Sequence, residues 1–514
     1  MGVELTVAVA LVVAGALVRA PQVGPSSLWL DDAWLALASK ADGVGELVTV
    51  GVTAPGFAAL LAAVVAVVGF SSSSAQALPF VLGVAAAPVL YLVARRLGLG
   101  RGAALVGAVL LLASPVHVAY SGRVKPFTAD AVLSVIVLFA GWRVVERPDD
   151  GRRWGWVAVV AVGSVVVSAA VATSVAGAYL AGLVATARHR PRRLAPALAS
   201  LSGFGAFALV WYYAVIRPAS TPGLRAYWAD HYLDLGDGPV RAVGALAMST
   251  GNVLDGFSGV PVALGGVAVV LAAVVAGVRR PLLAVLLLAP LAAGVVLAVL
   301  EVAPFGGGRT DIHLYPALAL LVALGLHLVL RPLRPPTAGV ASLAALVLVA
   351  APLRPAPPYP AEDLRPLVEV VESSAGPDDA IAVYSASRWG HALYTSGPVD
   401  LRPDPTSANG FTALAADPRV RVLGPHRDVP ARYEPEVEAL TAGHDRIWLL
   451  SSHVRGDFAV LEQLLSDRGY EDVRTEDRPG ASLTLWVRKG PHPREIRART
   501  TVPQTGVLRS GGGG

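Results

Sequence analysis

Apolar residues occupy most of this chain in long runs separated by short polar segments. Runs long enough to cross about 30 Å of hydrocarbon predict about eleven membrane-spanning helices. These runs lie at residues 3–20, 77–94, 102–119, 127–142, 154–170, 172–187, 195–215, 262–278, 281–300, 311–330 and 337–352. The pattern therefore predicts a mainly α, polytopic transmembrane domain over residues 1–352.

Basic residues recur in clusters after every second predicted span. The clusters are Arg95/Arg96/Arg101, Arg143/Arg147/Arg152/Arg153, Arg188/Arg190/Arg192/Arg193, Arg279/Arg280 and Arg331/Arg334. Because arginine and lysine accumulate in cytoplasmic loops, one consistent topology places all of these clusters in the cytoplasm. The intervening loops and everything after residue 352 then face the outside.

A further apolar run at residues 52–70 leaves two topologies open. If this run crosses the membrane fully, the preceding loop with Asp31 and Asp32 faces the cytoplasm. If it is a juxtamembrane or re-entrant helix, that loop faces outward. The run has about the minimal length for a span and lacks a basic anchor at either end, so length alone does not decide.

Residues 353–490 have a different pattern. Prolines crowd the exit from the last span, and short strand-like runs then alternate with helical patterns. The predicted strands lie at 380–384, 420–423, 446–451 and 483–487, and the predicted helices at 361–374 and 457–468. This alternation predicts a small α/β domain, extracytoplasmic in the topology above. Residues 491–514 end in a glycine run and are predicted to be a disordered tail or a remnant of the expression vector.

Composition agrees with a membrane protein. Hydrophobic residues make up 54% of the 514 residues and charged residues 15%, and the mean hydropathy is +0.58, whereas soluble domains carry about 25% charged residues. The net charge of +5 comes from arginines beside apolar runs, so it does not indicate nucleic-acid binding. Cysteine is absent, which excludes disulfides and thiol catalysis.

The most informative polar feature is the acid pair Asp31 and Asp32, directly after the first span. Carboxylates are costly beside hydrocarbon and mark function when they occur there. Two adjacent carboxylates resist joint ionisation, so one of them is a candidate general base with a raised pKa. The alternative is a plain helix cap by Asp32.

Two later polar segments lie on the same predicted side. Residues 120–127 contain Arg123 and Lys125, and residues 304–311 contain Arg309 after a glycine run at 306–308. Cations at the outer boundary suit a phosphate, and glycine amides form anion nests. We therefore predict that the cations bind a donor phosphate. The neighbouring polar residues predicted to bind substrate are Tyr120, Asp130, Asp311, His313 and Tyr315.

Simpler interpretations exist for each segment. Arg123 and Lys125 are also what membrane anchors look like, residues 306–308 could form a flexible turn, and Arg309 with Asp311 could form a surface ion pair. We assign the aromatic residues at the boundary to the interfacial belt, with no chemistry implied: Trp29, Trp34, Trp211 and Trp228. The histidines of the distal domain have no metal spacing and are predicted surface or core residues: His391, His444 and His453.

Taken in order, the three segments resemble a known family. Residues 28–33 (LWLDDA) resemble the LWxDEA signature of the first external loop in glycosyltransferase C (GT-C) superfamily enzymes. The branch is that of protein O-mannosyltransferases, lipid A aminoarabinose transferase and rhizobial lipopolysaccharide sugar transferases. Residues 120–130 are similar to its YSxEVKPYxxD loop, and residues 305–316 resemble its GxGR…LP element.

The resemblance implies a fold, a reaction and a set of roles. A juxtamembrane helix follows the acidic loop without crossing, which favours the re-entrant alternative for 52–70. The first acid of the pair, Asp31, is the base, and Asp32 stands where glutamate is usual. The donor is a sugar on a polyprenyl phosphate, and the anomeric centre is inverted. Arg123 departs from the family, since a glutamate is usual there, which puts any metal role of that position in doubt.

We therefore predict an inverting, polyprenyl-phosphate-sugar-dependent glycosyltransferase of a bacterial cytoplasmic membrane, with its active site outside. The acceptor is a glycan, lipid or protein of the cell envelope, and the sugar, arabinofuranose or mannose among others, is left open. No cofactor is specified, and a divalent metal stays open. The alternatives are a transporter or lipid flippase, which would place charge near the midplane, and a non-catalytic membrane scaffold.

Overall fold

The computed structural model describes residues 2–24, 26–234, 236, 238–351, 362–407, 409–426 and 429–490. The chain divides into two compact units, one formed by Met1–Ala361 with Pro398–Leu414 and the other by Glu362–Gly397 with Ala415–Gly514. Each unit has a hydrophobic core of its own. The predicted proline-rich exit and the predicted tail at 491–514 lie outside the described residues.

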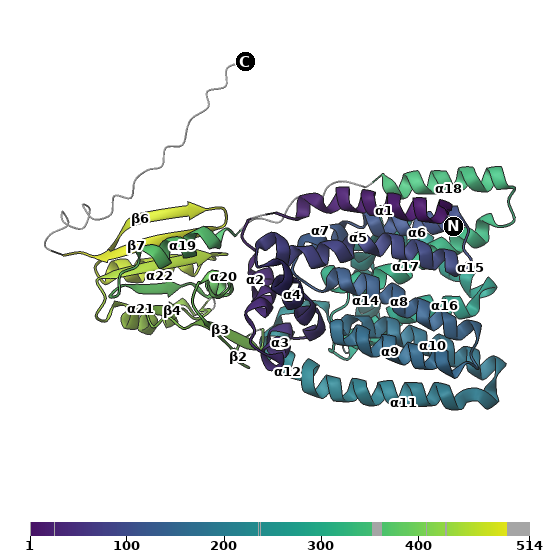
Figure 1. The fold of residues 1–514 in the computed structure, drawn as a ribbon, viewed down its shortest axis with the longest axis horizontal. Coiled ribbons are helices and arrows are strands. Elements are labelled where there is room, and N and C mark those ends of the chain that lie inside the picture. Colours follow the sequence, from purple (N-terminus) through teal and green to yellow (C-terminus); the bar gives the residue numbers. More distant parts are fainter. Residues whose placement is uncertain are drawn as a thin grey trace, which may run out of the picture. The chain divides into compact units, whose positions relative to one another are not determined.

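Long apolar helices build the first unit, and Figure 1 shows most of them running alongside one another. They are α1 (Gly2–Arg19), α5 (Ser72–Arg96), α6 (Arg101–Ala113), α8 (Phe127–Glu146), α9 (Gly151–Val167), α10 (Ala172–His189), α11 (Leu194–Trp211), α14 (Pro239–Ser258), α15 (Val262–Arg279), α16 (Pro281–Val299), α17 (Tyr315–Leu330) and α18 (Pro335–Ala350). Shorter helices lie between them: α2 (Leu30–Ala36), α3 (Val44–Gly51), α4 (Pro55–Val68), α7 (Pro115–Ala119), α12 (Arg217–Ala219) and α13 (Pro222–Tyr227).

Each predicted span coincides with helix in the structure. Among the described residues, 8 helices are long and apolar enough to cross a membrane, or up to 10 if each of two bent pairs counts as one span. The difference from the predicted number arises partly at α9 and α18, which have 17 and 16 residues. Both fall short of the roughly 20 residues of a typical span.

The apolar run at 52–70 forms α4, which meets α3 at a bend of 117°. Two local features cause this break. Val52 has a positive φ of 54°, which β-branched residues rarely adopt, and Pro55 begins the next helix because its fixed φ suits a first helical position. The pair is therefore a broken span or a re-entrant loop, the same two alternatives that the sequence leaves open.

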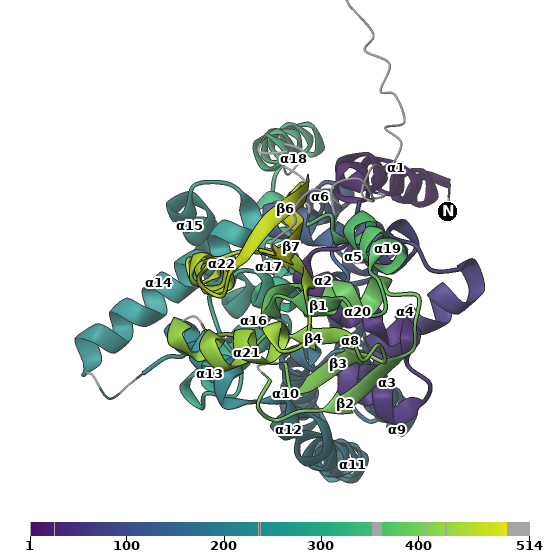
Figure 2. The same cartoon turned by 90° about the vertical axis from the view of Figure 1, so that its left-hand side faces the viewer.

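The second unit is a small α/β domain. Its helices are α19 (Leu364–Ser374), α20 (Arg388–Tyr394), α21 (Tyr433–Thr441) and α22 (Phe458–Asp467), and its strands are β1 (Ala380–Val383), β4 (Val420–Val422), β5 (Arg446–Ser452), β6 (Tyr470–Arg478) and β7 (Ala481–Arg488). The sheet has the order β4-β1-β5-β7-β6, in which β1 pairs parallel to β4 and β5 while β7 pairs antiparallel to β5 and β6. Figure 2 shows α19 and α20 on one side of this sheet and α21 and α22 on the other.

The predicted strands at 380–384, 420–423, 446–451 and 483–487 match β1, β4, β5 and β7. β6 was not predicted, because its burial pattern is mostly exposed and its sequence is charged. The hairpin of β2 (Val399–Pro403) and β3 (Phe411–Ala415) lies in the predicted domain 353–490 but, apart from Ala415, groups with the first unit. There, Phe411 packs against Trp34 with ring centroids 6.3 Å apart.

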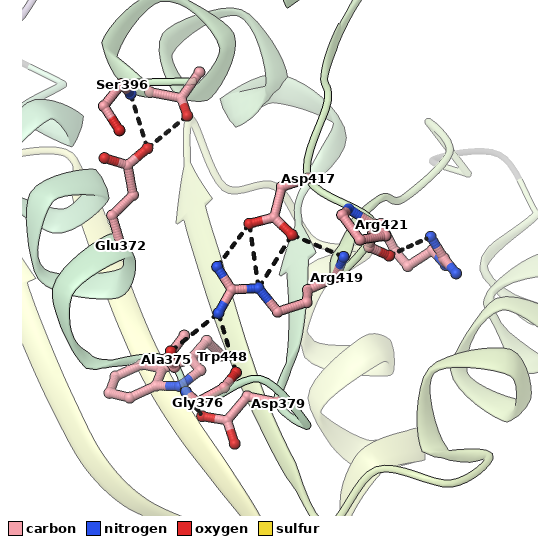
Figure 3. Close-up of polar contacts among 11 residues, drawn as sticks. Glu372, Ala375, Gly376, Asp379, Ser396, Asp417, Arg419, Arg421 and Trp448 are labelled. Carbon is pink, nitrogen blue, oxygen red and sulfur yellow. Dashed lines mark hydrogen bonds and ion pairs between the residues drawn. The ribbon is translucent and has the colours of Figure 1, made fainter. Parts of the chain in front are cut away.

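A polar network closes one end of the sheet (Figure 3). Arg419 pairs with Asp417 at 2.7 Å and donates to the carbonyls of residues 375 and 376, which follow α19. This guanidinium lowers the pKa of Asp417. Beside it, the indole Nε1 of Trp448 donates to Asp379 at 2.9 Å, so the buried tryptophan of β5 has a hydrogen-bond partner, as buried polar groups normally do.

Candidate active site

The acid pair lies in the first turn of α2, which begins after the extended residue Trp29. Neighbouring residues of a helix point about 100° apart, so the two carboxylates have different surroundings. Asp32 is 2% exposed, whereas the side chain of Asp31 is 20% exposed. Of the two acids, only Asp31 is accessible to solvent.

Asp32 connects the first motif to the second. Its Oδ2 lies 2.6 Å from Nε of Arg123, and its Oδ1 accepts a hydrogen bond of 3.0 Å from the amide of Val124. Both charged side chains are buried. Burial is the main reason that the pKa of Asp32 is raised; Arg123 opposes the rise, and Asp31 contributes less. The raised pKa therefore belongs to Asp32, the buried carboxylate that pairs with Arg123. Its desolvation has a larger effect than its repulsion by Asp31.

Asp31 connects the first motif to the third. Its Oδ2 lies 3.4 Å from Nη1 of Arg309, a residue 278 positions later in the chain. Nη2 of Arg309 also contacts the hydroxyl of Tyr227 at 3.3 Å, and Tyr120 of the second motif hydrogen-bonds the same guanidinium. Residues from all three motifs, and from the loop before α14, therefore meet at one place.

Lys125 completes the cluster of cations. It is buried, lies near Asp31 and Asp32, and has Nζ 3.5 Å from the centre of the Trp34 ring. Burial lowers the pKa of Lys125 to about 8, against the pull of the two carboxylates. Arg123, Lys125 and Arg309 together outnumber the two carboxylates by one positive charge when all five groups are ionised, and an anion is the ligand that this excess attracts.

The tryptophans of this region have a role that the sequence did not reveal. Trp29 stacks under Arg123, with the guanidinium carbon 4.4 Å from the ring centre, and Trp228 lies 5.4 Å from that of Arg309. With Trp34, three of the four residues assigned to the interfacial belt instead cover the site cations, which holds those cations in place. Trp211 packs against Phe207 in α11. The missed signal is spacing, since Trp29 and Trp34 lie two residues from an acid of the pair.

The glycine run at 306–308 is not an open anion nest. Gly306 and Gly308 have positive φ of 80° and 71°, as a nest requires, but their amides donate to the two oxygens of Asp311 at 3.1 and 2.8 Å. Tyr315 donates to the carbonyl of Gly308 at 3.3 Å. Both Asp311 and Tyr315 are fully buried. They fix the loop that presents Arg309, and the predicted anion nest is corrected to an internal carboxylate clamp.

Two other predicted substrate-binding residues lie apart from the cluster. Asp130 is buried in α8, where Ser168 is its hydrogen-bond partner. The Nδ1 of His313 lies 2.8 Å from the carbonyl of Thr310, and the ring is buried. Among the described residues, neither side chain forms a hydrogen bond or an ion pair with Asp31 or Arg309. The order of motifs could not distinguish these neighbours in sequence from neighbours in space.

A buried arginine supports the second motif from α1. Arg19 is 0% exposed and donates from Nε to Ser121 at 3.0 Å and from Nη2 to the carbonyl of Leu112 at 3.3 Å. The same Nη2 lies 2.9 Å from Nδ1 of His117, which is also buried. The sequence analysis did not single out Arg19, because one arginine at the end of an apolar run looks like an anchor.

The donor set does not suit a bound metal. Within the described part of the chain, no three histidine or acidic side chains are grouped as a metal site requires. The acids closest to such a role, Asp31 and Asp32, face Arg309 and Arg123 instead. Arginine occupies the position where the related motif carries an acid.

Comparisons with known proteins complete the description of the site. Residues 52–213 match the model of the family described as dolichyl-phosphate-mannose-protein mannosyltransferase. That match covers less than half of the chain. A search of curated proteins gave no match.

Solved structures of similar fold cover nearly all of the chain. ArnT from Cupriavidus metallidurans in the apo state is 15% identical with a TM-score of 0.56, over 94% of this chain and 98% of that chain. Its structure bound to undecaprenyl phosphate gives the same identity and TM-score over 94% and 97%. The arabinofuranosyltransferase AftD from Mycobacteria is 17% identical with a TM-score of 0.53, over 93% of this chain and 41% of that chain.

Proposed function

We propose that this chain, which has the fold of the GT-C superfamily, transfers a sugar from a polyprenyl-phosphate donor to an acceptor of the cell envelope. The observation that carries the proposal is the contact between Asp31 and Arg309 within a cluster of cations. A base and a phosphate-binding group must lie this close together, because the sugar phosphate places the anomeric carbon next to the phosphate. The similarity to an ArnT structure that holds undecaprenyl phosphate supports this donor class.

In the proposed reaction, Asp31 is the base. Its carboxylate takes the proton of an acceptor hydroxyl while that oxygen attacks the anomeric carbon. The bond between this carbon and the phosphate oxygen breaks on the opposite face, and its electron pair leaves with the polyprenyl phosphate. The configuration is therefore inverted. Asp31 suits this role better than Asp32, because Asp32 is buried against Arg123.

The cations stabilise the leaving group. Negative charge grows on the phosphate as its bond to the sugar breaks, and preorganised cations gain most from charge that develops in the transition state. Arg309 offers a fork of donors and Lys125 a point charge. Arg123 contributes the field of its charge, while its contact with Asp32 holds the first and second motifs together. Tyr227 and Tyr120 orient Arg309.

Transfer is tested with the purified full chain and a panel of radiolabelled polyprenyl-phosphate sugars that includes arabinofuranose and mannose. We expect release of polyprenyl phosphate with one of them. Asp31→Asn keeps the shape but removes the base, so it should lower the rate by about 10²–10⁴-fold while binding of undecaprenyl phosphate is retained. Asp230→Asn, at an exposed acid of the loop after α13, is the matched control and should not change the rate.

Two results would contradict this proposal. Transfer at the wild-type rate by Asp31→Asn would exclude Asp31 as the base. Movement of an intact lipid across vesicles with no release of sugar would favour the flippase.

We further propose that the site faces the outside of the cytoplasmic membrane. Because the chain contains no cysteine, a single Ser26→Cys variant tests this directly. Ser26 is exposed and lies shortly before α2. A membrane-impermeant maleimide should label it in intact spheroplasts, whereas Arg192→Cys, in a predicted cytoplasmic cluster, should react only after lysis. The opposite pattern would place the acid pair in the cytoplasm and make α4 a spanning helix.

A further inference from the structure

The second unit carries a polar groove at the edge of its sheet. The groove has a volume of about 530 Å³, within the range of small-ligand sites. Its floor is formed by β6 and β7 and its wall by α22. The lining residues are Phe458, Ala459, Glu462, Gln463, Ser466, Asp472, Thr475, Asp477, Ser482, Thr484 and Trp486.

The floor is built from cross-strand pairs that share one face. Asp472 lies opposite Trp486, Thr475 opposite Thr484, and Asp477 opposite Ser482. Side chains alternate between the faces of a strand, so Asp472 would point away from this face in a regular strand. The register shift between Asp472 and Arg474 brings it back. A bulge that re-aims one side chain is a typical feature of a binding edge.

The carboxylates of the groove differ from Glu476 of β6 in their partners. Glu462 projects from α22 toward the floor, and its pKa is raised by burial and by the neighbouring Asp472. No described residue forms an ion pair with Glu462, Asp472 or Asp477. By contrast, Glu476, on the same strand but the other face, pairs with Arg474 and Arg478.

An unpartnered tryptophan lies in the same groove. Trp486 is 7% exposed, and its indole Nε1 has no hydrogen-bond partner in the part of the chain that the structure describes. The other buried tryptophan of this sheet, Trp448, donates to Asp379 (Figure 3). A buried donor without a partner costs about 1–3 kcal/mol, so a ligand that accepts from Trp486 removes this cost. The N–H is covered in this conformation of the ring, so a ligand reaches it only when the ring turns.

These groups select the chemistry of the ligand. Ionised carboxylates only accept hydrogen bonds, whereas the indole N–H only donates. A metal ion or a basic peptide would satisfy the acids but not the indole, and a phosphate would be repelled by the acids. Hydroxyl groups both donate and accept, and the Trp486 ring offers an apolar surface. A neutral, polyhydroxylated ligand satisfies all of these groups together.

We propose that this groove binds a neutral glycan chain. That the bound glycan is the acceptor rests on the proposed function. In this arrangement Glu462, Asp472 and Asp477 accept from sugar hydroxyls, Thr475 and Thr484 exchange hydrogen bonds with them, and Trp486 donates to a ring or hydroxyl oxygen. The second unit thereby gives the chain its acceptor class, independently of the donor.

The test uses the purified full chain and neutral arabinan and mannan oligosaccharides, with binding measured by calorimetry. We expect one of these probes to bind, and Asp472→Asn or Trp486→Phe to raise its Kd about tenfold, as the loss of one charge-assisted or buried hydrogen bond predicts. Glu476→Gln, on the opposite face of β6, is the matched control and should leave the Kd unchanged. Unfolding temperatures identify any variant that fails to fold.

Several outcomes would overturn the inference. They are the absence of binding by every probe, equal binding to wild type and Asp472→Asn, or binding of Ca²⁺ that Asp472→Asn removes and no sugar affects. The donor assay separates the two proposals. Wild-type protein that cleaves a polyprenyl-phosphate sugar but binds no oligosaccharide refutes only the groove, whereas oligosaccharide binding without donor cleavage refutes only the transferase.

Discussion

The cation cluster of the first unit and the groove of the second unit differ in whether their carboxylates have cationic partners. In the first unit, Asp32 faces Arg123 and Asp31 faces Arg309, and tryptophan rings cover the cations. In the groove, three carboxylates converge without any cation among the described residues. One region is electrically paired before a ligand arrives, and the other is unpaired.

The difference indicates what each region is prepared to bind. Paired charges cost less to bury than isolated ones, and on the proposed function Arg309 exchanges the carboxylate of Asp31 for the donor phosphate. Carboxylates without counter-ions persist only where solvent or a hydroxylated ligand stabilises them. The difference is what the two proposals require, a charged lipid phosphate in the first unit and a neutral sugar chain in the second.

Breaking the buried pair should have the largest effect. Asp32→Asn leaves Arg123 as an uncompensated buried charge, and Arg123→Gln does the same to Asp32, so each should lower stability by about 3–5 kcal/mol. The double variant Asp32→Asn/Arg123→Gln should lose less than either single variant, because neutral partners remain. Apparent unfolding temperatures in detergent measure this. Glu369→Gln, which breaks the exposed pair with Arg365, is the control with little effect, and simple additivity at 32 and 123 would contradict the pairing.

Removing the fork of Arg309 should have the next largest effect. Arg309→Gln should lower kcat/KM for the donor about 100-fold, as loss of one transition-state donor does elsewhere. The kcat/KM of Arg309→Lys should lie between those of the wild type and Arg309→Gln, because lysine keeps the charge but cannot contact both Asp31 and Tyr227. Arg225→Gln, at an exposed arginine of α13, serves as the control. A comparable rise in the KM for the acceptor would mean that Arg309 maintains the structure of the site and does not bind the donor specifically.

The smallest expected effect is the pH dependence of donor kcat/KM, which separates the two regions without any substitution. Lys125 has a pKa lowered to about 8, so it is charged below that pH and neutral above it. Donor kcat/KM should therefore fall as the pH rises through about 8, by up to tenfold per unit, because this parameter follows the free enzyme. Lys125→Arg should abolish this fall. Glycan binding in the groove should stay constant over the same range, and a parallel decline there would argue against two separate modes of recognition.

The sequence predicted the fold because its signals are local and strong. Apolar runs and arginine clusters located the helices, and the order of three motifs identified the superfamily before any contact was known. The sequence missed the charged edge strand β6 and left the run at 52–70 open between a span and a re-entrant helix, as the bent pair of α3 and α4 still does. Both depend on backbone conformation and pairing, which hydropathy does not encode.

The site was predictable only in part for a similar reason. Composition and motif order identified Asp31, Asp32, Arg123, Lys125 and Arg309, all of which meet in the structure. Sequence could not say which acid faces which cation, nor that Asp311 fills the glycine loop by itself. Tyr227 carried no signal, because it reaches Arg309 across 82 positions of chain.

Arg19 gives the first helix a second duty. Its guanidinium connects the end of α1 to the backbone of Leu112 and to Ser121. Ser121 lies two residues before Arg123, the cation that pairs with Asp32. Arg19→Leu should therefore destabilise the segment that carries Arg123, although Arg19 itself lies in another helix. The amino-terminal helix, whose sequence resembles a simple membrane anchor, therefore also supports the segment that carries Arg123.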